Sequence, residues 1–162
     1  MSNQTIDLLM DHRSIRKYEK KPVSAETVQT ILRCAQMAPT SSYLQAYSII
    51  EVTDPAKREV LKTISGGQKW VVEAPLALLF CADLHRCERF LPIQDKNVLH
   101  NHELFTVAVA DAALAAQKAF IAAQAKATLR PFLEHIISRK RCVYKTKFFA
   151  SCFSQLLKRN YY

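Results

Sequence analysis

The chain has 162 residues, 49% of them hydrophobic, and its 23 Lys/Arg residues against 14 Asp/Glu residues give a net charge of +9 at pH 7. This length and composition predict one globular domain, alone or with an appendage. Contiguous apolar runs fall short of the ~20 residues of a membrane span, and no signal-peptide pattern opens the chain. We therefore expect a cytoplasmic protein without a membrane segment.

The first third of the chain predicts two helices and a strand. Residues 4–12 carry apolar side chains at helical spacing, and Ser24 is a suitable N-cap for a second helix over residues 25–38. A polar loop follows. Residues 47–54 are rich in β-branched and aromatic side chains, which predicts a strand.

The next stretch predicts another helix and a buried strand. Pro55 suits the first turn of a helix over residues 55–64, which the pair Gly66–Gly67 would end. Residues 76–83 form a continuous apolar run, as in a strand that is buried on both faces. Residues 84–90 are consistent with a short helix.

The longest helix signal covers residues 103–126. Ten alanines fall within this segment, and alanine is the strongest helix former. Small side chains let a neighbouring backbone approach closely. The segment is therefore predicted to be a core helix, a dimer-interface helix, or both.

Charge and glycine content change abruptly after Lys126. Residues 1–126 hold 15 Lys/Arg and 13 Asp/Glu, whereas residues 127–162 hold 8 Lys/Arg and a single acid. The second segment also lacks glycine and holds seven of the fourteen Phe/Tyr residues. It shows no clear helix or strand period, so we expect it to differ in origin from the rest.

A basic cluster follows the first predicted helix. His12, Arg13, Ser14 and Arg16 provide N–H and O–H donors within five positions. Arginine presents a planar fork of donors that matches a phosphate group. The cluster predicts a phosphate site, and a solvated basic loop is the alternative.

Two further loops offer polar donors. Ser41, Ser42 and Gln45 lie in a loop before a predicted strand, where ligand contacts are common. Gln68 follows the Gly66–Gly67 pair, whose backbone is free to adopt unusual conformations. Ordinary turn chemistry and a helix stop are the alternatives for these two loops.

Other kinds of site are not indicated. His100 and His102 lack the i, i+4 spacing of a helical zinc pair, so no metal site is predicted. The five cysteines, an odd number without CxxC spacing, are expected to be reduced thiols. No GxGxxG, P-loop or GxSxG motif occurs.

Five ordered motifs together resemble the bacterial nitroreductase family. They are HRSIRKY, APTSSYLQAYSIIEVTD, SGGQKWV, LLFCADLHR and DAALAAQKAFIAAQAK, and the resemblance covers residues 5–126. More narrowly, they are similar to its NADPH-dependent branch of oxygen-insensitive nitroreductases and flavin reductases. This resemblance implies an α+β fold in which helices flank a mixed sheet and the alanine-rich helix serves the core and the dimer.

The resemblance also implies an activity. Members are homodimers that bind FMN at the subunit interface and pass a hydride from NADPH through the flavin N5 to nitroaromatics, quinones or free flavin. No side chain needs to act as a catalytic base, because the hydride moves between stacked rings. The implied FMN-binding residues are His12, Arg13, Ser14, Arg16, Ser41, Ser42, Gln45 and Gln68.

The resemblance implies different roles for these residues. His12, Arg13 and Ser14 would meet the phosphate and ribityl end of FMN, and Arg16 the pyrimidine edge of its ring, where a cation stabilises the reduced flavin. Ser41 and Ser42 match a loop that reaches the flavin of the other protomer. Gln68 matches a polar contact to the ribityl chain or ring edge.

The family pattern stops near Lys126. Members continue with a glycine-rich segment, a strand and a Lys-x-Arg stretch that completes the phosphate site, and these do not follow here. We therefore expect residues 1–126 to be the N-terminal part of an FMN-binding domain. Residues 127–162 are expected to be an unrelated basic, aromatic tail that arose from a shifted reading frame or truncation.

Two alternatives to an active oxidoreductase remain. The chain is an inactive remnant if the lost segment is essential for FMN binding. The basic tail, with aromatic side chains that can stack on bases, would instead suit a nucleic-acid or membrane-surface binder. Residues that select NADPH over NADH lie beyond position 126 in the family, so the choice of nucleotide is left open.

Overall fold

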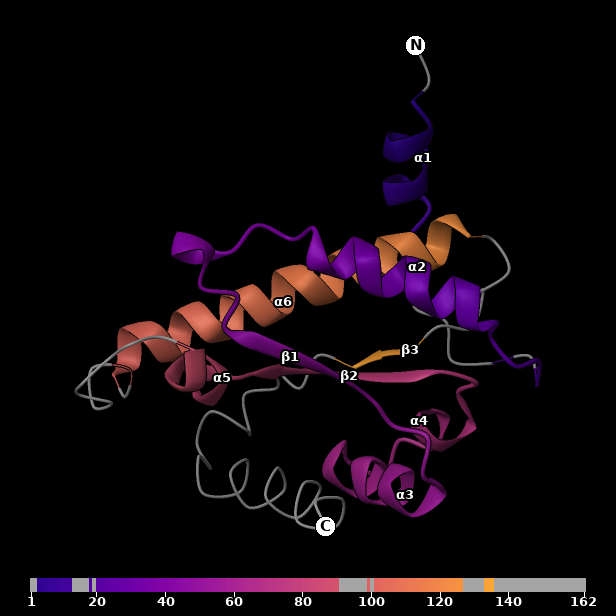
Figure 1. Ribbon diagram of the computed structural model, residues 1–162. Coiled ribbons are helices and arrows are strands. Elements are labelled where there is room, and N and C mark those ends of the chain that lie inside the picture. The colour runs from indigo at the N-terminus through magenta and orange to yellow at the C-terminus, as the bar shows by residue number, and fades with distance from the viewer. Residues whose placement is uncertain are drawn as a thin grey trace.

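The computed structural model describes residues 3–12, 18, 20–90, 99 and 101–126, and the backbone of residues 133–135. Helices cover both faces of a small sheet, with α2 and α6 on one face and α3 and α4 on the other (Figure 1). The elements in chain order are α1 (Gln4–Met10), α2 (Ala25–Gln36), the 3-10 helix η1 (Ser41–Tyr43), β1 (Tyr47–Glu51), α3 (Pro55–Ile64), α4 (Trp70–Glu73), β2 (Ala77–Ala82), α5 (Leu84–Phe90), α6 (His102–Ala125) and β3 (Leu133–His135).

The sheet is mixed, with the strand order β1-β2-β3. β1 and β2 are antiparallel, and Ile49 lies opposite Phe80. β2 and β3 are parallel, and Ala77 lies opposite Leu133. This arrangement confirms the predicted α+β fold with a mixed sheet. It also places three residues of the segment 127–162 beside β2, where the sequence pattern predicted no strand.

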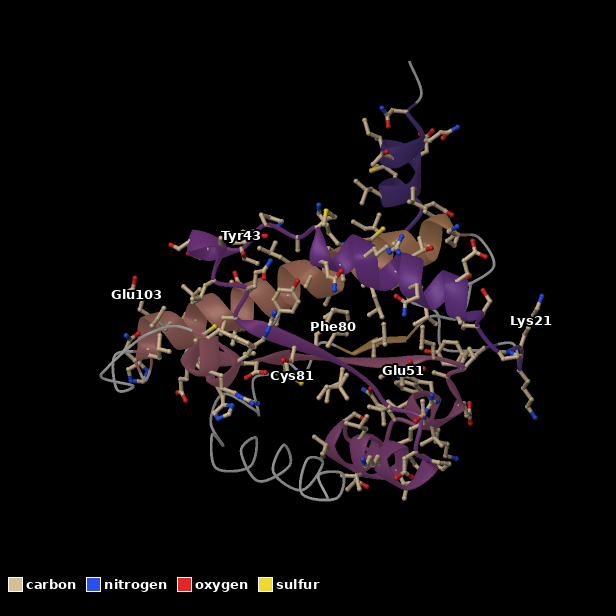
Figure 2. All side chains as sticks on the ribbon, viewed as in Figure 1. Lys21, Tyr43, Glu51, Phe80, Cys81 and Glu103 are labelled. Atoms are coloured by element: carbon tan, nitrogen blue, oxygen red, sulfur yellow. The ribbon has the colours of Figure 1, made fainter. Side chains whose placement is uncertain are left out.

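β2 separates two parts of the hydrophobic core. Leu78 and Phe80 pack into the cluster formed with α2 and α6, whereas Leu79 and Cys81 pack into the cluster formed with α3 and α4. Figure 2 shows Phe80 and Cys81 pointing to opposite sides of the strand. Because side chains alternate along a strand, a continuous apolar run is required here, as the sequence predicted.

The pair α2–α6 forms the larger of the two helical layers. The Ser24 side chain accepts a hydrogen bond from the Thr27 N–H at 3.3 Å, which confirms the predicted N-cap of α2. At the other end of α2, Lys118 Nζ donates to the Met37 carbonyl at 2.8 Å. Six buried alanines line the inner face of α6: Ala108, Ala112, Ala115, Ala116, Ala119 and Ala123.

The predicted strand over residues 47–54 is shorter in the structure. β1 ends at Glu51, and Asp54 instead caps α3, because its carboxylate accepts a hydrogen bond from the Ala56 N–H at 2.8 Å. Pro55 then occupies the first turn of α3, as predicted. The helix signal was therefore stronger than the strand signal at this boundary.

α6 is long and apolar enough to cross a bilayer by length and composition alone, with a mean hydropathy of 1.5 over its most apolar 18 residues. The search for contiguous apolar runs in the sequence did not detect this helix, because Asp111 and Lys118 interrupt its apolar residues. One face of α6 packs on α2 and the sheet, and that face contains the carboxylate of Asp111. α6 is therefore the core helix of this fold.

Candidate functional site

The loop between α2 and β1 has a strained backbone. Ser42, Tyr43 and Gln45 all have positive φ angles, of 49°, 56° and 50°. Residues with a Cβ atom rarely adopt this left-handed region, because the Cβ atom approaches the following carbonyl oxygen. Three such residues within four positions require restraint from outside the loop.

A buried carboxylate on α6 supplies part of that restraint. Asp111 is 1% exposed, and its two oxygens accept hydrogen bonds from the Ser41 N–H at 3.1 Å and the Ala46 N–H at 3.2 Å. The two donors lie at the two ends of the left-handed stretch. The carboxylate thus joins both ends of the loop to the core helix.

The carbonyl groups of the loop are held from the other side, by the start of α5. The Asp83 N–H donates to the Ala46 carbonyl at 2.9 Å. Arg86 Nη1 lies 3.4 Å from the carbonyl oxygens of both Gln45 and Tyr47. Carbonyl groups near the end of the loop therefore have partners, just as the N–H groups of Ser41 and Ala46 do.

A thiol packs directly beneath the same loop. Cys87 Sγ donates to the Leu44 carbonyl at 3.6 Å, and Cys87 forms a small core cluster with Ala46 and Ala108. Burial raises the pKa of the Cys87 thiol. Cys87 is therefore a packing residue at neutral pH rather than a nucleophile.

The serine and tyrosine side chains of this loop point outward, whereas Leu44 and Ala46 pack against the core. Ser41 and Ser42 are exposed, Gln45 is half-buried, and Tyr43 at the tip is 82% exposed (Figure 2). The hydroxyl and amide groups of Ser41, Ser42 and Gln45 make no hydrogen bond to another described residue. The loop thus combines a restrained backbone with free polar groups.

A second turn joins α3 to α4. Gly66 and Gly67 have φ angles of 86° and 82°, and a Cβ atom at either position would meet nothing within 4 Å. Gln68, which follows them, is half-buried. The glycines serve the backbone conformation, and the space beside them is open.

Only one member of the predicted basic cluster is described. His12 is exposed. The centroids of the His12 and Phe120 rings are 4.9 Å apart, and the planes of the two rings meet at an angle of 57°. Arg13, Ser14 and Arg16 lie outside the described residues. The position of His12 marks where that cluster begins, beside the C-terminal part of α6.

The described candidates lie in three separate places. The loop 41–46 is attached to α6 at Asp111, and His12 contacts α6 at Phe120, nine residues further along. Nine residues of helix span roughly 13 Å. Gln68 lies between α3 and α4, across the sheet from α6. Within one copy of the chain, these residues do not form a single cluster.

One hollow was not anticipated by the sequence. It has a volume of about 480 Å³ and lies where the segment after the basic cluster meets the end of α4. Its lining residues are Tyr18, Lys20, Lys21, Pro22, Glu73 and Pro75. The two lysines are exposed, and a carboxylate shares the same wall, so no single charge dominates this hollow.

Asp111 is the important residue that the sequence predictions missed. A signal was present, because Asp111 lies among ten alanines at helical spacing from Ala108 and Ala115. An acidic side chain on the inner face of a core helix is rare unless it has partners. Its partners were two backbone N–H groups some 65 to 70 positions away, which no local pattern identifies.

Comparison with known proteins identifies the family. The model of the nitroreductase family matches residues 9–127 of this chain. The chain belongs to the nitroreductase family. The predicted resemblance is therefore confirmed, and the matched region contains all eight residues that were predicted to bind the cofactor.

Relatives in this family have similar sequences and folds. An FMN reductase (NADPH) of Bacillus subtilis is 42% identical over 125 residues, which cover 75% of this chain and 50% of the relative. The solved structure of a B. subtilis nitroreductase superposes with a TM-score of 0.72 at 41% identity, covering 76% of this chain and 51% of that one.

A third member is similar in structure. The NADPH:FMN oxidoreductase of Vibrio harveyi, solved in complex with NAD+, has a TM-score of 0.70 and is 36% identical. That comparison covers 76% of this chain and 53% of the Vibrio protein. The chain thus spans about half the length of these nitroreductase relatives.

Proposed function

We propose that the chain is an FMN-dependent NAD(P)H oxidoreductase that reduces nitroaromatics, quinones or free flavins. The observation that carries this proposal is the family match over residues 9–127, which contains the restrained loop 41–46 and the turn at Gly66–Gly67. Relatives over the same region are named FMN reductase and NADPH nitroreductase.

The chemistry of the described groups fits a flavin nucleotide. FMN carries a phosphate, a polyhydroxy chain and a ring edge rich in hydrogen-bond acceptors, so its site needs N–H and O–H donors. Ser41, Ser42, Gln45 and Gln68 offer hydroxyl and amide groups that have no hydrogen-bond partner among the described residues. Open space beside Gly66 and Gly67 leaves the backbone of that turn accessible, while the two glycine N–H groups bond to the Thr63 and Lys62 carbonyls.

The side chains of this family member would bind and orient the cofactor. We propose that His12, Arg13 and Ser14 hold the phosphate and ribityl chain, and that Arg16 places a positive charge at the pyrimidine edge. Ser41, Ser42, Gln45 and Gln68 would provide further polar contacts to the cofactor. Bound FMN would supply the hydride chemistry, so no protein side chain needs to act as a general base.

A homodimer is part of the proposal. The candidates lie in three places on one copy, and a second copy would bring the loop 41–46 of one protomer to the cofactor of the other. Exposed apolar side chains support this arrangement, because α1 has no buried residue although it is amphipathic. The large apolar residues exposed on α1 and α6 are Ile6, Leu9, Met10, Phe105 and Leu114.

We also propose a cytoplasmic location, as for a soluble enzyme that uses NADPH, and a boundary near Lys126. The family match ends at residue 127, close to where the charge and glycine content change. Residues 127–162 would then be a separate basic tail. Translation of the encoding DNA in its other two frames tests the frameshift origin, which fails if neither frame yields a glycine-rich continuation.

Absorption spectroscopy during size-exclusion chromatography tests the proposed function. We expect a visible flavin band to co-elute with a dimer after incubation with FMN, and NADPH oxidation to depend on an added nitroaromatic or quinone. A colourless protein that gains no flavin from excess FMN would contradict the proposal and would favour the inactive remnant. Steeply salt-dependent retention of nucleic acid, without flavin, would favour the basic-tail binder.

A further inference from the structure

Asp111 is the single carboxylate in the buried core of the described residues. Its neighbours on the inner face of α6 are alanines. Placing a carboxylate there is unfavourable unless its charge is compensated by hydrogen bonds. Both of its oxygens are used, one for each end of the loop 41–46.

The arrangement requires a carboxylate in particular. The Ser41 and Ala46 N–H groups are both donors, and each one points to a different oxygen. Asparagine provides one oxygen and an NH₂ group, so one of the two backbone donors would face another donor. An amide at position 111 therefore fills the same volume but cannot hold both ends of the loop.

The loop needs this support because its own residues disfavour its shape. Ser42, Tyr43 and Gln45 are left-handed without being glycine. Released from Asp111, the segment would relax toward ordinary backbone angles, and the directions of its side chains would change. The same segment carries Ser41, Ser42 and Gln45, the polar groups assigned above to the cofactor.

We propose that Asp111 is a positioning residue for the flavin site: its buried carboxylate holds the loop 41–46 in its left-handed shape and so fixes the donors that the loop presents. Asp111 itself does not touch the cofactor and acts through the backbone of the loop. This inference rests on the proposed FMN-binding function, although the holding of the loop can be measured in the free protein.

The test compares full-length Asp111→Asn with two matched controls. Lys118→Met removes another hydrogen bond from an α6 side chain to the backbone between α2 and β1, at Met37. Ile31→Val removes one methyl group from the fully buried interface of α2 and leaves the loop unchanged. The measurements are amide hydrogen exchange at Ser41 and Ala46 by NMR, and FMN affinity by quenching of flavin fluorescence.

We expect faster exchange at both amides in Asp111→Asn, and a dissociation constant for FMN that rises about 10- to 100-fold. Both controls should keep loop protection and FMN affinity within about twofold of the wild type, although Ile31→Val lowers the denaturation midpoint. Equal weakening of FMN binding in Ile31→Val would reveal a general stability effect and would overturn the positioning role.

Two other outcomes also decide the matter. Wild-type affinity for FMN in Asp111→Asn, despite rapid exchange at Ser41 and Ala46, would overturn the link between the loop and the cofactor. If Asp111→Asn loses its native circular dichroism spectrum, Asp111→Glu replaces it in the same measurements. Glutamate keeps two acceptor oxygens but places them one methylene group further from the backbone. If the wild type itself binds no FMN, the proposed function fails, whereas amide exchange still shows whether Asp111 holds the loop.

Discussion

Two turns in this molecule use left-handed backbone, and they achieve it in different ways. The turn after α3 uses Gly66 and Gly67, and its N–H groups bond to carbonyls of the preceding helix turn, such as Gly67 N–H to Lys62 at 2.9 Å. The loop 41–46 uses residues with side chains and is held by Asp111 from a distant helix.

The difference concerns where the restraint comes from. Glycine accepts positive φ without a steric penalty, so the turn after α3 is stable on local contacts alone. The loop 41–46 retains side chains at every position, and the penalty is offset by tertiary hydrogen bonds. A site that needs polar groups on a sharply bent segment requires the second solution.

The largest expected effect concerns Arg58, which joins the elements on either side of the glycine turn. Arg58 on α3 donates from Nε to the Val52 carbonyl at 2.8 Å and from Nη1 to the carbonyls of Val72 and Ala74, tying β1, α3 and α4 together. We expect Arg58→Met to lower the free energy of unfolding by about 2–4 kcal/mol, because buried carbonyls lose charged donors. Urea denaturation measures this change.

Lys62→Met is the matched control for Arg58→Met. Lys62 lies on the same helix, and its salt bridge to Glu59 is at the surface, with an N–O distance of 2.8 Å. Exposed pairs contribute ~0.5 kcal/mol or less in helices, so the midpoint should hardly move. Equal effects of the two substitutions would show that the bonds of Arg58 do not stabilise the fold.

The strain in the loop 41–46 predicts the next effect. Valine is β-branched and strongly disfavours positive φ, so Gln45→Val should destabilise the fold by about 1–3 kcal/mol. Gln45→Gly removes the penalty and should be nearly neutral. Thermal denaturation of the two variants without FMN separates this effect from cofactor binding. Similar midpoints for valine and glycine would indicate that the loop is not strained at this position.

The glycine turn should respond more weakly. At Gly67, an added Cβ atom meets no neighbour within 4 Å, so only the left-handed backbone opposes a side chain there. Gly67→Ala should lower the free energy of unfolding by about 1–2 kcal/mol. Gly67→Asn should lose less, because asparagine tolerates this region. If Gly67→Ala lowers the free energy of unfolding by much more than this range, the added Cβ atom must clash with a neighbouring residue.

Thiol reactivity reports on both regions without altering stability. Cys34 is partly exposed, whereas Cys87 lies under the loop 41–46 and Cys81 faces α3 and α4. Burial raises the pKa of Cys81 to about 12. At mildly alkaline pH we expect rapid alkylation of Cys34 and strong protection of the other two thiols, measured by peptide mass spectrometry. Rapid labelling of Cys87 would show that the loop opens readily.

The raised pKa of Cys81 also predicts how the stability of the fold changes with pH. Its thiol stays protonated in the folded state up to a pKa of about 12, whereas an ordinary thiol ionises near 9.0. The unfolded state therefore loses a proton first as the pH rises. The stabilising effect of the buried neutral thiol is complete below about pH 9 and is lost between pH 9 and about 12.

The sequence predicted most of the elements, because their signals are local. Ser24, Pro55 and the apolar run 76–83 each act through neighbours in the chain, and the structure places a cap, a helix start and a buried strand there. The contacts of the loop 41–46 depend on residues 65 to 70 positions away, and no local pattern reports them. The mixed sheet was inferred from the family resemblance.

The buried alanines of α6 have a consequence for how the fold tolerates sequence change. Ala108, Ala115, Ala116 and Ala119 are all at 0% exposure, so an added methyl group on this face would enter the packed core rather than solvent. Large-to-small substitutions, the usual route by which cores lose stability, are almost impossible there because little side chain exists to remove. Variation in this helix should therefore accumulate at its outer positions, while the inner face, apart from Asp111, should accept hardly any residue larger than alanine.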